Sequence, residues 1–289
     1  MRIAAAPISW GVCEVPGWGR VLDHDTVLRE MADLGLTATE LGPPGYLPAD
    51  PAALAATLDR HGLGLVGGFL AVVLHDAGQQ RSVVDLAGRQ AELLAAAGGD
   101  VLVLAASTGL DGYDERPPLN QAQWHTLVDT AGMIRDVAVR AGVRTVLHPH
   151  VGTQVETTAE VRRFLADADL PLCVDTGHLL IGGTDPVELV RAHPHRIGHV
   201  HLKDVRADLA EQVRDGLISY TEAVAQGIYV PLGDGDIDLA ALLKLLRDND
   251  YRGWYVLEQD TALPEDGDQA DQAPRLATAR SLAYLDTVY

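Results

Sequence analysis

The chain has 289 residues, of which 47% are hydrophobic and 22% charged, a balance typical of a globular protein with a large core. Its 22 Lys and Arg against 41 Asp and Glu give a formal net charge of −19, which argues against nucleic acid and anionic membranes as partners. Two cysteines, Cys13 and Cys173, are too few for a disulfide framework, and no apolar run approaches the roughly 18 residues of a membrane span, so we expect a cytoplasmic protein.

Short β-like segments alternate with amphipathic helical segments along the whole chain. Asp50, Thr157 and Asp185 stand where helix N-caps are expected. Glycines at positions 35, 62, 98 and 142 follow helical segments, as left-handed C-caps do. The predicted strands are 2–9, 37–41, 64–70, 101–106, 144–148, 171–175, 197–202 and 253–258. The predicted helices are 23–34, 51–61, 81–97, 121–141, 157–167, 185–193, 238–248 and 274–287.

Eight such strand–helix units predict a single (β/α)8 TIM barrel of the α/β class that spans residues 1–289. A doubly wound open sheet is the alternative, but eight units exceed what most such sheets carry. The first predicted strand is also not followed by the G-x-G-x-x-G motif of dinucleotide-binding folds. Residues 203–236 form a longer insertion before the last unit, and 263–274 read as an acidic loop.

Polar residues follow the apolar runs of the last four predicted strands, in "VLHPH", "CVDTGH", "HVHLKD" and "YVLEQD". In a TIM barrel these ends meet at the catalytic mouth. His148, Asp175, His201 and Glu258 then supply two imidazoles and two carboxylates, a set that suits a divalent ion such as Mn²⁺, Co²⁺, Zn²⁺ or Fe²⁺. A hydrogen-bonded network that braces the loops is the alternative. Four such residues on consecutive strand ends favour the metal.

Three further residues lie beside this set in the sequence. His150 is either another ligand, in place of or beside His148, or a substrate contact. His178, three residues after Asp175, is a catalytic candidate that could reach the same centre. Lys203 points the same way as His201 along the strand and could stabilise an oxyanion, or pair with its neighbouring aspartate. His199, one step deeper in the barrel, receives no role.

Four residues at other strand ends or in loops are weaker candidates. Glu40 is a substrate contact, a general base or a salt-bridged rim carboxylate. Glu156 is a candidate acid or base, or it interacts with the start of the following helix. Trp10, placed better than Trp18, could line a substrate pocket or pack in the core, and His75 is a substrate contact or a loop histidine.

Together with "APISWGVCEVPGWG", "TELGPPGYLP", "HPHVGT" and "VPLGDGDID", these motifs carry a resemblance to a known family. From about residue 4 to residue 260 the chain resembles the xylose isomerase-like superfamily of sugar-phosphate isomerases and epimerases, and within it the inosose dehydratase branch. The usual metal ligands of the superfamily are Glu, Asp, His and Glu. Asp175, His201 and Glu258 match the last three, while His148 replaces the first Glu, as in the inosose dehydratase pattern.

The resemblance implies a metal-dependent lyase that dehydrates 2-keto-myo-inositol or a related cyclic keto-polyol through an enediolate. An isomerase or 3-epimerase acting on a ketose is the alternative. The resemblance also implies a small polyol or ketose as partner and Mn²⁺ or Co²⁺ as cofactor, with Mg²⁺, Zn²⁺ or Fe²⁺ as alternatives. Relatives of this kind are often dimers or tetramers, which leaves a homo-oligomer open. A DNA-repair endonuclease is disfavoured by the acidic charge, and a non-catalytic polyol sensor by the intact metal set.

Overall fold

The computed structural model describes residues 1–13, 15, 17–264 and 272–289. Most of the acidic loop predicted at 263–274 therefore lies outside the described residues. In the described parts of the chain, no helix combines the length and the hydropathy that a membrane span requires.

Nine parallel strands form one sheet, in the order β3-β2-β1-β11-β8-β7-β6-β5-β4. Its first and last strands, β3 (Gly64–Leu65) and β4 (Gly67–Val72), are separated in the chain only by Val66, so the sheet closes on itself as a barrel. The predicted TIM barrel is confirmed, with the third predicted strand divided in two. The other strands are β1 (Ile3–Ala5), β2 (Ala38–Thr39), β5 (Val101–Ala106), β6 (Arg144–Leu147), β7 (Leu172–Asp175), β8 (Ile197–Leu202) and β11 (Tyr255–Leu257).

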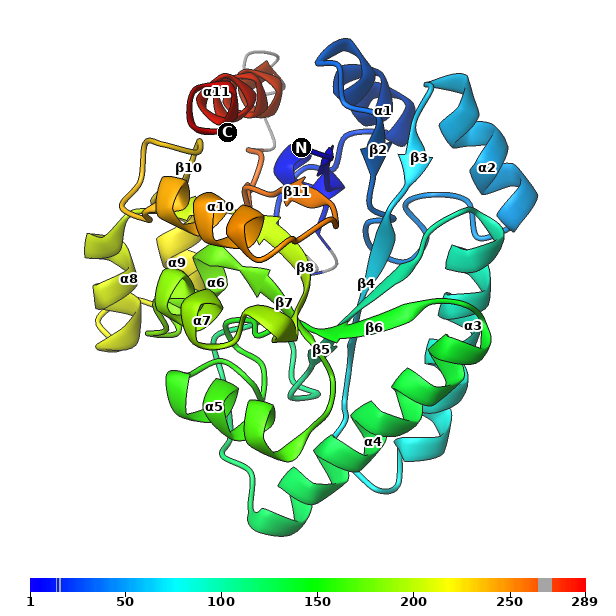
Figure 1. The fold of residues 1–289 in the computed structure, drawn as a ribbon, viewed down its shortest axis with the longest axis vertical. Coiled ribbons are helices and arrows are strands. Elements are labelled where there is room, and N and C mark those ends of the chain that lie inside the picture. Colours follow the sequence, from blue (N-terminus) through cyan, green and yellow to red (C-terminus); the bar gives the residue numbers. More distant parts are fainter. Residues whose placement is uncertain (14, 16, 265–271) are drawn as a thin grey trace.

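Helices lie around the outside of the strands (Figure 1), close to the predicted positions. The predicted caps form: the side chains of Asp50, Thr157 and Asp185 all accept backbone N–H groups of the first helical turn. The four predicted C-terminal glycines have positive φ. The helices of the repeating units are α1 (His24–Asp33), α2 (Pro51–Arg60), α3 (Gln80–Ala96), α4 (Gln121–Arg140), α5 (Thr158–Asp167), α7 (Pro186–Ala192), α10 (Leu239–Asp248) and α11 (Ala273–Val288).

The interior of the barrel is filled by small side chains. Residues of alternating position along the strands point inward. Two hydrophobic clusters built mainly from strand residues occupy this space, separate from the main core between strands and helices. Their buried members are Ala4, Ala6, Ala38, Val66 and Val256 in one cluster and Val101, Val103, Val146 and Cys173 in the other.

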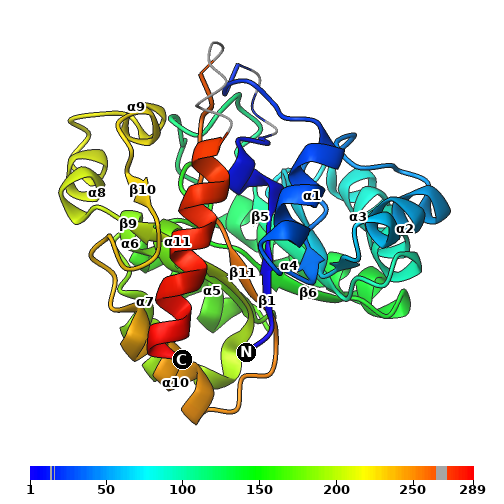
Figure 2. The same cartoon turned by 90° about the horizontal axis from the view of Figure 1, so that it is seen from above.

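The predicted insertion forms a small subdomain beside the mouth of the barrel (Figure 2). Its apolar residues make a separate core with Val151 and Ile181, which come from the chain after β6 and β7. The insertion therefore packs against the C-terminal ends of the strands and builds one wall of the mouth. It contains β9 (Asp204–Val205), α8 (Ala207–Arg214), α9 (Tyr220–Ala225) and β10 (Tyr229–Val230), and β9 and β10 pair antiparallel.

Candidate metal centre and active site

The structure brings together the four residues predicted as metal ligands. They lie at or next to the C-terminal ends of β6, β7, β8 and β11, which are neighbours in the sheet, and their ligand atoms all lie within 4.8 Å of one another. His148 Nε2 is 3.3 Å from Asp175 Oδ2, and His201 Nδ1 is 3.1 Å from Glu258 Oε2. Asp175 is fully buried, and the side chain of Glu258 is 9% exposed.

The donor set fits a divalent cation. Asp175 Oδ1 is used at the start of α6 (Thr176–Ile181), where it accepts the backbone N–H of His178 at 2.9 Å. Asp175 Oδ2 and His201 Nδ1 are buried, have no hydrogen-bond partner among the described residues and lie 3.7 Å apart. A cation among two imidazoles and two carboxylates would satisfy them.

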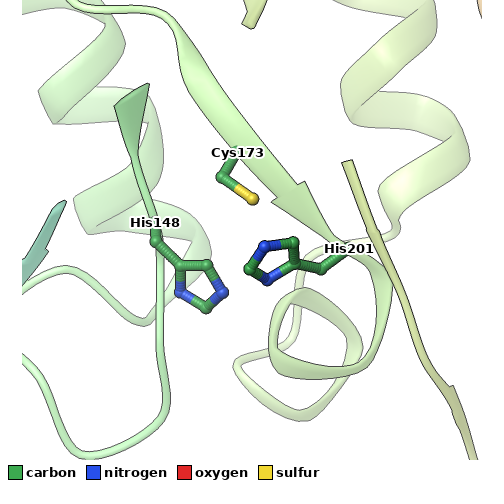
Figure 3. A group of neighbouring side chains, drawn as sticks. All are labelled: His148, Cys173 and His201. Carbon is green, nitrogen blue, oxygen red and sulfur yellow. The ribbon is translucent and has the colours of Figure 1, made fainter. Parts of the chain in front are cut away.

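Cys173 lies one layer deeper on the inner face of β7. Figure 3 shows its thiol and the rings of His148 and His201 pointing toward one another, and the three ligand atoms lie within 4.8 Å. Burial raises the pKa of the Cys173 thiol to about 11. Because a thiol binds metal as thiolate, the carboxylate set is the better one for a cation.

Lys203 places a positive charge against this set. Its Nζ atom lies 3.3 Å from Asp175 Oδ2, 3.2 Å from Glu258 Oε2, 2.6 Å from Asp260 Oδ1 and 3.0 Å from His178 Nε2. Burial disfavours the ammonium form, but the carboxylates outweigh burial and hold the pKa of Lys203 well above its usual value. The side chain therefore stays charged.

A cavity that is open to solvent lies above these residues. Six predicted site residues line it: Glu40, His148, His150, His201, Lys203 and Glu258. His178 lies behind them and stacks on His150, with ring centroids 3.7 Å apart. His150 is outside the four-residue ligand group, which contains His148 instead.

Besides Asp175 and His178, which lie behind the lining, three predicted site residues are not among the described residues that line the cavity. Trp10 is fully buried and donates its indole N–H to Glu30 at 2.7 Å, while Trp18 lines the cavity in its place. His75 follows β4 outside the cavity. Glu156 Oε2 accepts the backbone N–H of Gly152 at 2.7 Å and pairs with an arginine, so it braces the loop after β6.

Sequence reasoning missed several residues of the site. Asp260 stands two residues after Glu258, the same spacing as His148 and His150, and this spacing could have indicated it. Its Oδ2 accepts the hydroxyl of Tyr220 at 2.9 Å, and Tyr220 and Tyr229 hydroxyls lie 3.0 Å apart. Both tyrosines come from the insertion, where no strand pattern predicted a contact with the site. Phe69 and Tyr113 also line the cavity.

With this geometry established, comparison with known proteins decides the family. A family model described as xylose isomerase-like TIM barrel matches residues 28–286. The chain belongs to this family. It is 36% identical over 275 residues to the inosose dehydratase of Geobacillus kaustophilus, which covers 91% of this chain and 89% of that protein. The inosose dehydratase of Erwinia tasmaniensis is 32% identical, over 90% of each chain.

Solved structures of other proteins agree with the fold. A D-allulose 3-epimerase from Methylomonas sp. superposes with a TM-score of 0.71 at 17% identity and covers 100% of this chain and 98% of its own. A probable 3-DHS dehydratase from Bacillus anthracis gives a TM-score of 0.70 at 16% identity, over 98% of this chain and 99% of that one. At these identities the likeness concerns the barrel alone, and the family membership rests on the sequence matches.

Proposed function

We propose that the protein is a metal-dependent dehydratase, a carbon–oxygen lyase, that acts on 2-keto-myo-inositol or a closely related cyclic keto-polyol. The observation that carries the proposal is the set of four converging ligands beneath a solvent-open cavity, in a chain 36% identical to an inosose dehydratase. We infer that the cation would be held by His148, Asp175, His201 and Glu258. Mn²⁺ and Co²⁺ are the first candidates for this cation. A cation bound there supplies Lewis-acid polarisation of the substrate carbonyl.

His150 has the geometry of a base in this scheme. Its Nδ1 lies 2.6 Å from the backbone oxygen of Val151 and donates to it, which leaves the lone pair on Nε2. Burial, together with His148 and Lys203, holds the pKa of His150 well below its usual value, so the ring is neutral. Neutral His150 can accept the proton of the C–H bond next to the carbonyl.

Lys203 has the geometry of the acid. It lines the cavity as an ammonium, and His178 and Asp260 fix the position of its Nζ atom. The electron pair of the broken C–H bond forms the C=C bond while the C–O bond of the β-hydroxyl breaks. The hydroxyl takes the proton of Lys203 and leaves as water, so the reaction gives one water and an enol that isomerises to a dione. Glu156 has no part in this scheme.

The test is to incubate the purified protein, loaded with Mn²⁺ or Co²⁺, with inosose. We expect a dione that absorbs in the ultraviolet and a loss of one water by mass spectrometry. Lys203→Met and His150→Gln should each lower kcat by about 10²–10⁴-fold, since each removes one proton-transfer group. His75→Gln, outside the cavity, should keep the wild-type kcat. The proposal fails if no product forms with Mn²⁺, Co²⁺ or Mg²⁺.

An isomerase or 3-epimerase shares the first half of this reaction, in which a proton leaves the carbon next to the carbonyl. It differs in returning a proton to carbon rather than releasing water. Reaction in D₂O separates the two: deuterium in recovered ketose, together with an epimer and no dione, would replace the dehydratase by the epimerase.

A further inference from the structure

A carboxylate and an imidazole lie behind His201, on the side of its ring that faces away from Glu258. Glu40 follows β2, and His199 precedes His201 by two residues on the same face of β8. Glu40 is 2% exposed and His199 is fully buried. Burying ionisable groups is costly, so packing alone does not account for them.

The two residues converge on the back of His201. Glu40 Oε1 lies 2.8 Å from His199 Nε2 and 3.2 Å from His201 Nε2. An ionised carboxylate only accepts hydrogen bonds, so each imidazole donates from its Nε2. A His201 ring that carries its proton on Nε2 keeps the lone pair on Nδ1.

That lone pair lies where a ligand atom is needed. His201 Nδ1 is 3.1 Å from Glu258 Oε2 and 3.7 Å from Asp175 Oδ2, on the side of the metal set. We propose that Glu40 is a positioning residue of the metal centre, which fixes the tautomer and the ring orientation of His201, and that His199 fixes Glu40. The proposal rests on the metal centre of the proposed function. It gives Glu40 a different role from the substrate contact or general base expected from the sequence.

The alternative is that Glu40 and His199 only brace the barrel and have no role at the metal centre. β2 and β8 are separated in the sheet by β1 and β11, so the hydrogen bonds of Glu40 cross the interior. A brace would contribute to stability and leave metal affinity alone. A carboxylate that orients a metal-bound histidine typically contributes about 10–100-fold in metal affinity. Metal affinity therefore separates the two roles.

The first experiment titrates metal-free protein with Mn²⁺ and follows the signal of free Mn²⁺ by electron paramagnetic resonance. Glu40→Gln keeps the volume and loses the charge, and we expect its Kd to rise about 10–100-fold. His199→Gln should weaken binding less, and the double variant should add little to Glu40→Gln, because His199 acts through Glu40. Val103→Ala is the matched control: it removes volume from the same interior and should keep the wild-type Kd.

The second experiment reads the tautomer directly. In zinc-loaded protein with ¹⁵N-labelled histidine, we expect the His201 proton on Nε2 in the wild type, and a loss of this fixed tautomer in Glu40→Gln. Wild-type Mn²⁺ affinity in Glu40→Gln, or a proton on Nδ1 of His201, would overturn the proposal. So would a second Mn²⁺ per chain that His199→Gln abolishes, because Glu40 would then be a ligand. A wild type that binds no metal would instead remove the metal centre itself.

Discussion

The charge at the floor of the cavity depends on Lys203. Its ammonium lies within 3.3 Å of three carboxylates, of which Asp175 and Glu258 belong to the metal set and Asp260 does not. These groups are buried, so their mutual repulsion is only weakly screened by water. A bound divalent cation would therefore overlap in its effect with Lys203, because each neutralises the negative charge of Asp175 and Glu258.

Replacing Lys203 by Met should make the fold depend on metal. In the metal-free protein, Lys203→Met leaves buried carboxylates without a counter-charge, and we expect the free energy of unfolding to fall by about 3–5 kcal/mol. Mn²⁺ should restore part of this loss, so the metal-induced rise in Tm should exceed that of the wild type. Thermal unfolding with and without Mn²⁺ measures both.

Lys244 provides the control for this variant. It is exposed and pairs with Asp248 one turn along α10, and pairs of this kind contribute about 0.2–1 kcal/mol. Lys244→Met should therefore leave Tm nearly unchanged and the Mn²⁺ response as in the wild type. Equal metal-induced rises in Tm for Lys203→Met and the wild type would contradict the shared role of Lys203 and the cation.

At the scale of elements, the repeating units could be predicted because each leaves a local signal. The apolar runs, the caps and the C-terminal glycines place the strands and helices of the eight units, except that the first predicted strand, 2–9, ends at Ala5 and is followed by a 3-10 helix, Pro7–Trp10. α6 was not predicted, because its six residues follow β7 without a loop. Asp175 is both the last residue of β7 and the N-cap of α6. The elements of the insertion are short and depend on packing against the mouth of the barrel.

Asp204 links the two ends of the insertion. Its carboxylate accepts the backbone N–H groups of Val205, Gly233, Gly235 and Ile237, at 2.9 to 3.2 Å. Asp204→Ala would leave these donors without an acceptor, at roughly 1–3 kcal/mol for each one that water does not reach. We expect faster amide hydrogen exchange over residues 229–237 and a lower free energy of unfolding in urea.

The comparison variant for Asp204 is Asp236→Ala. Asp236 Oδ2 accepts a single, more exposed N–H group, from Ala207, so its loss should have a much smaller effect. Unchanged exchange over 229–237 in Asp204→Ala would show that the insertion holds its place without this carboxylate.

At the scale of the whole molecule, the topology explains how much of the site the sequence predicts. Parallel strands in a closed barrel all end at one mouth, so His148, Asp175, His201 and Glu258 could be expected to meet before their positions were known. The same reasoning could not place Tyr220 or the loop residue Tyr113, because neither lies at a strand end. It misplaced Trp10, which ends a 3-10 helix (Pro7–Trp10) and is buried, whereas Trp18, eight residues later, lines the cavity.

The closed sheet also lets one cation connect four strands. β6, β7, β8 and β11 are neighbours and each places one ligand in the metal set, so binding should hold this side of the barrel together. A ligand present at 100 times its Kd stabilises the folded state by about 2.7 kcal/mol. Chelation of the metal should therefore lower Tm by several degrees. Amides at the ends of these strands should lose more protection from hydrogen exchange than those of β4, on the other side of the barrel.

The net charge of −19 makes a control essential, since an acidic surface attracts divalent cations without a defined site. Asp175→Asn removes one central charge from the metal set and leaves the surface unchanged. We expect this variant to lose the Mn²⁺-dependent rise in Tm and the strand-specific protection. If Asp175→Asn kept both, the cation would stabilise the barrel from elsewhere on its surface, and the four strand ends would not be its site.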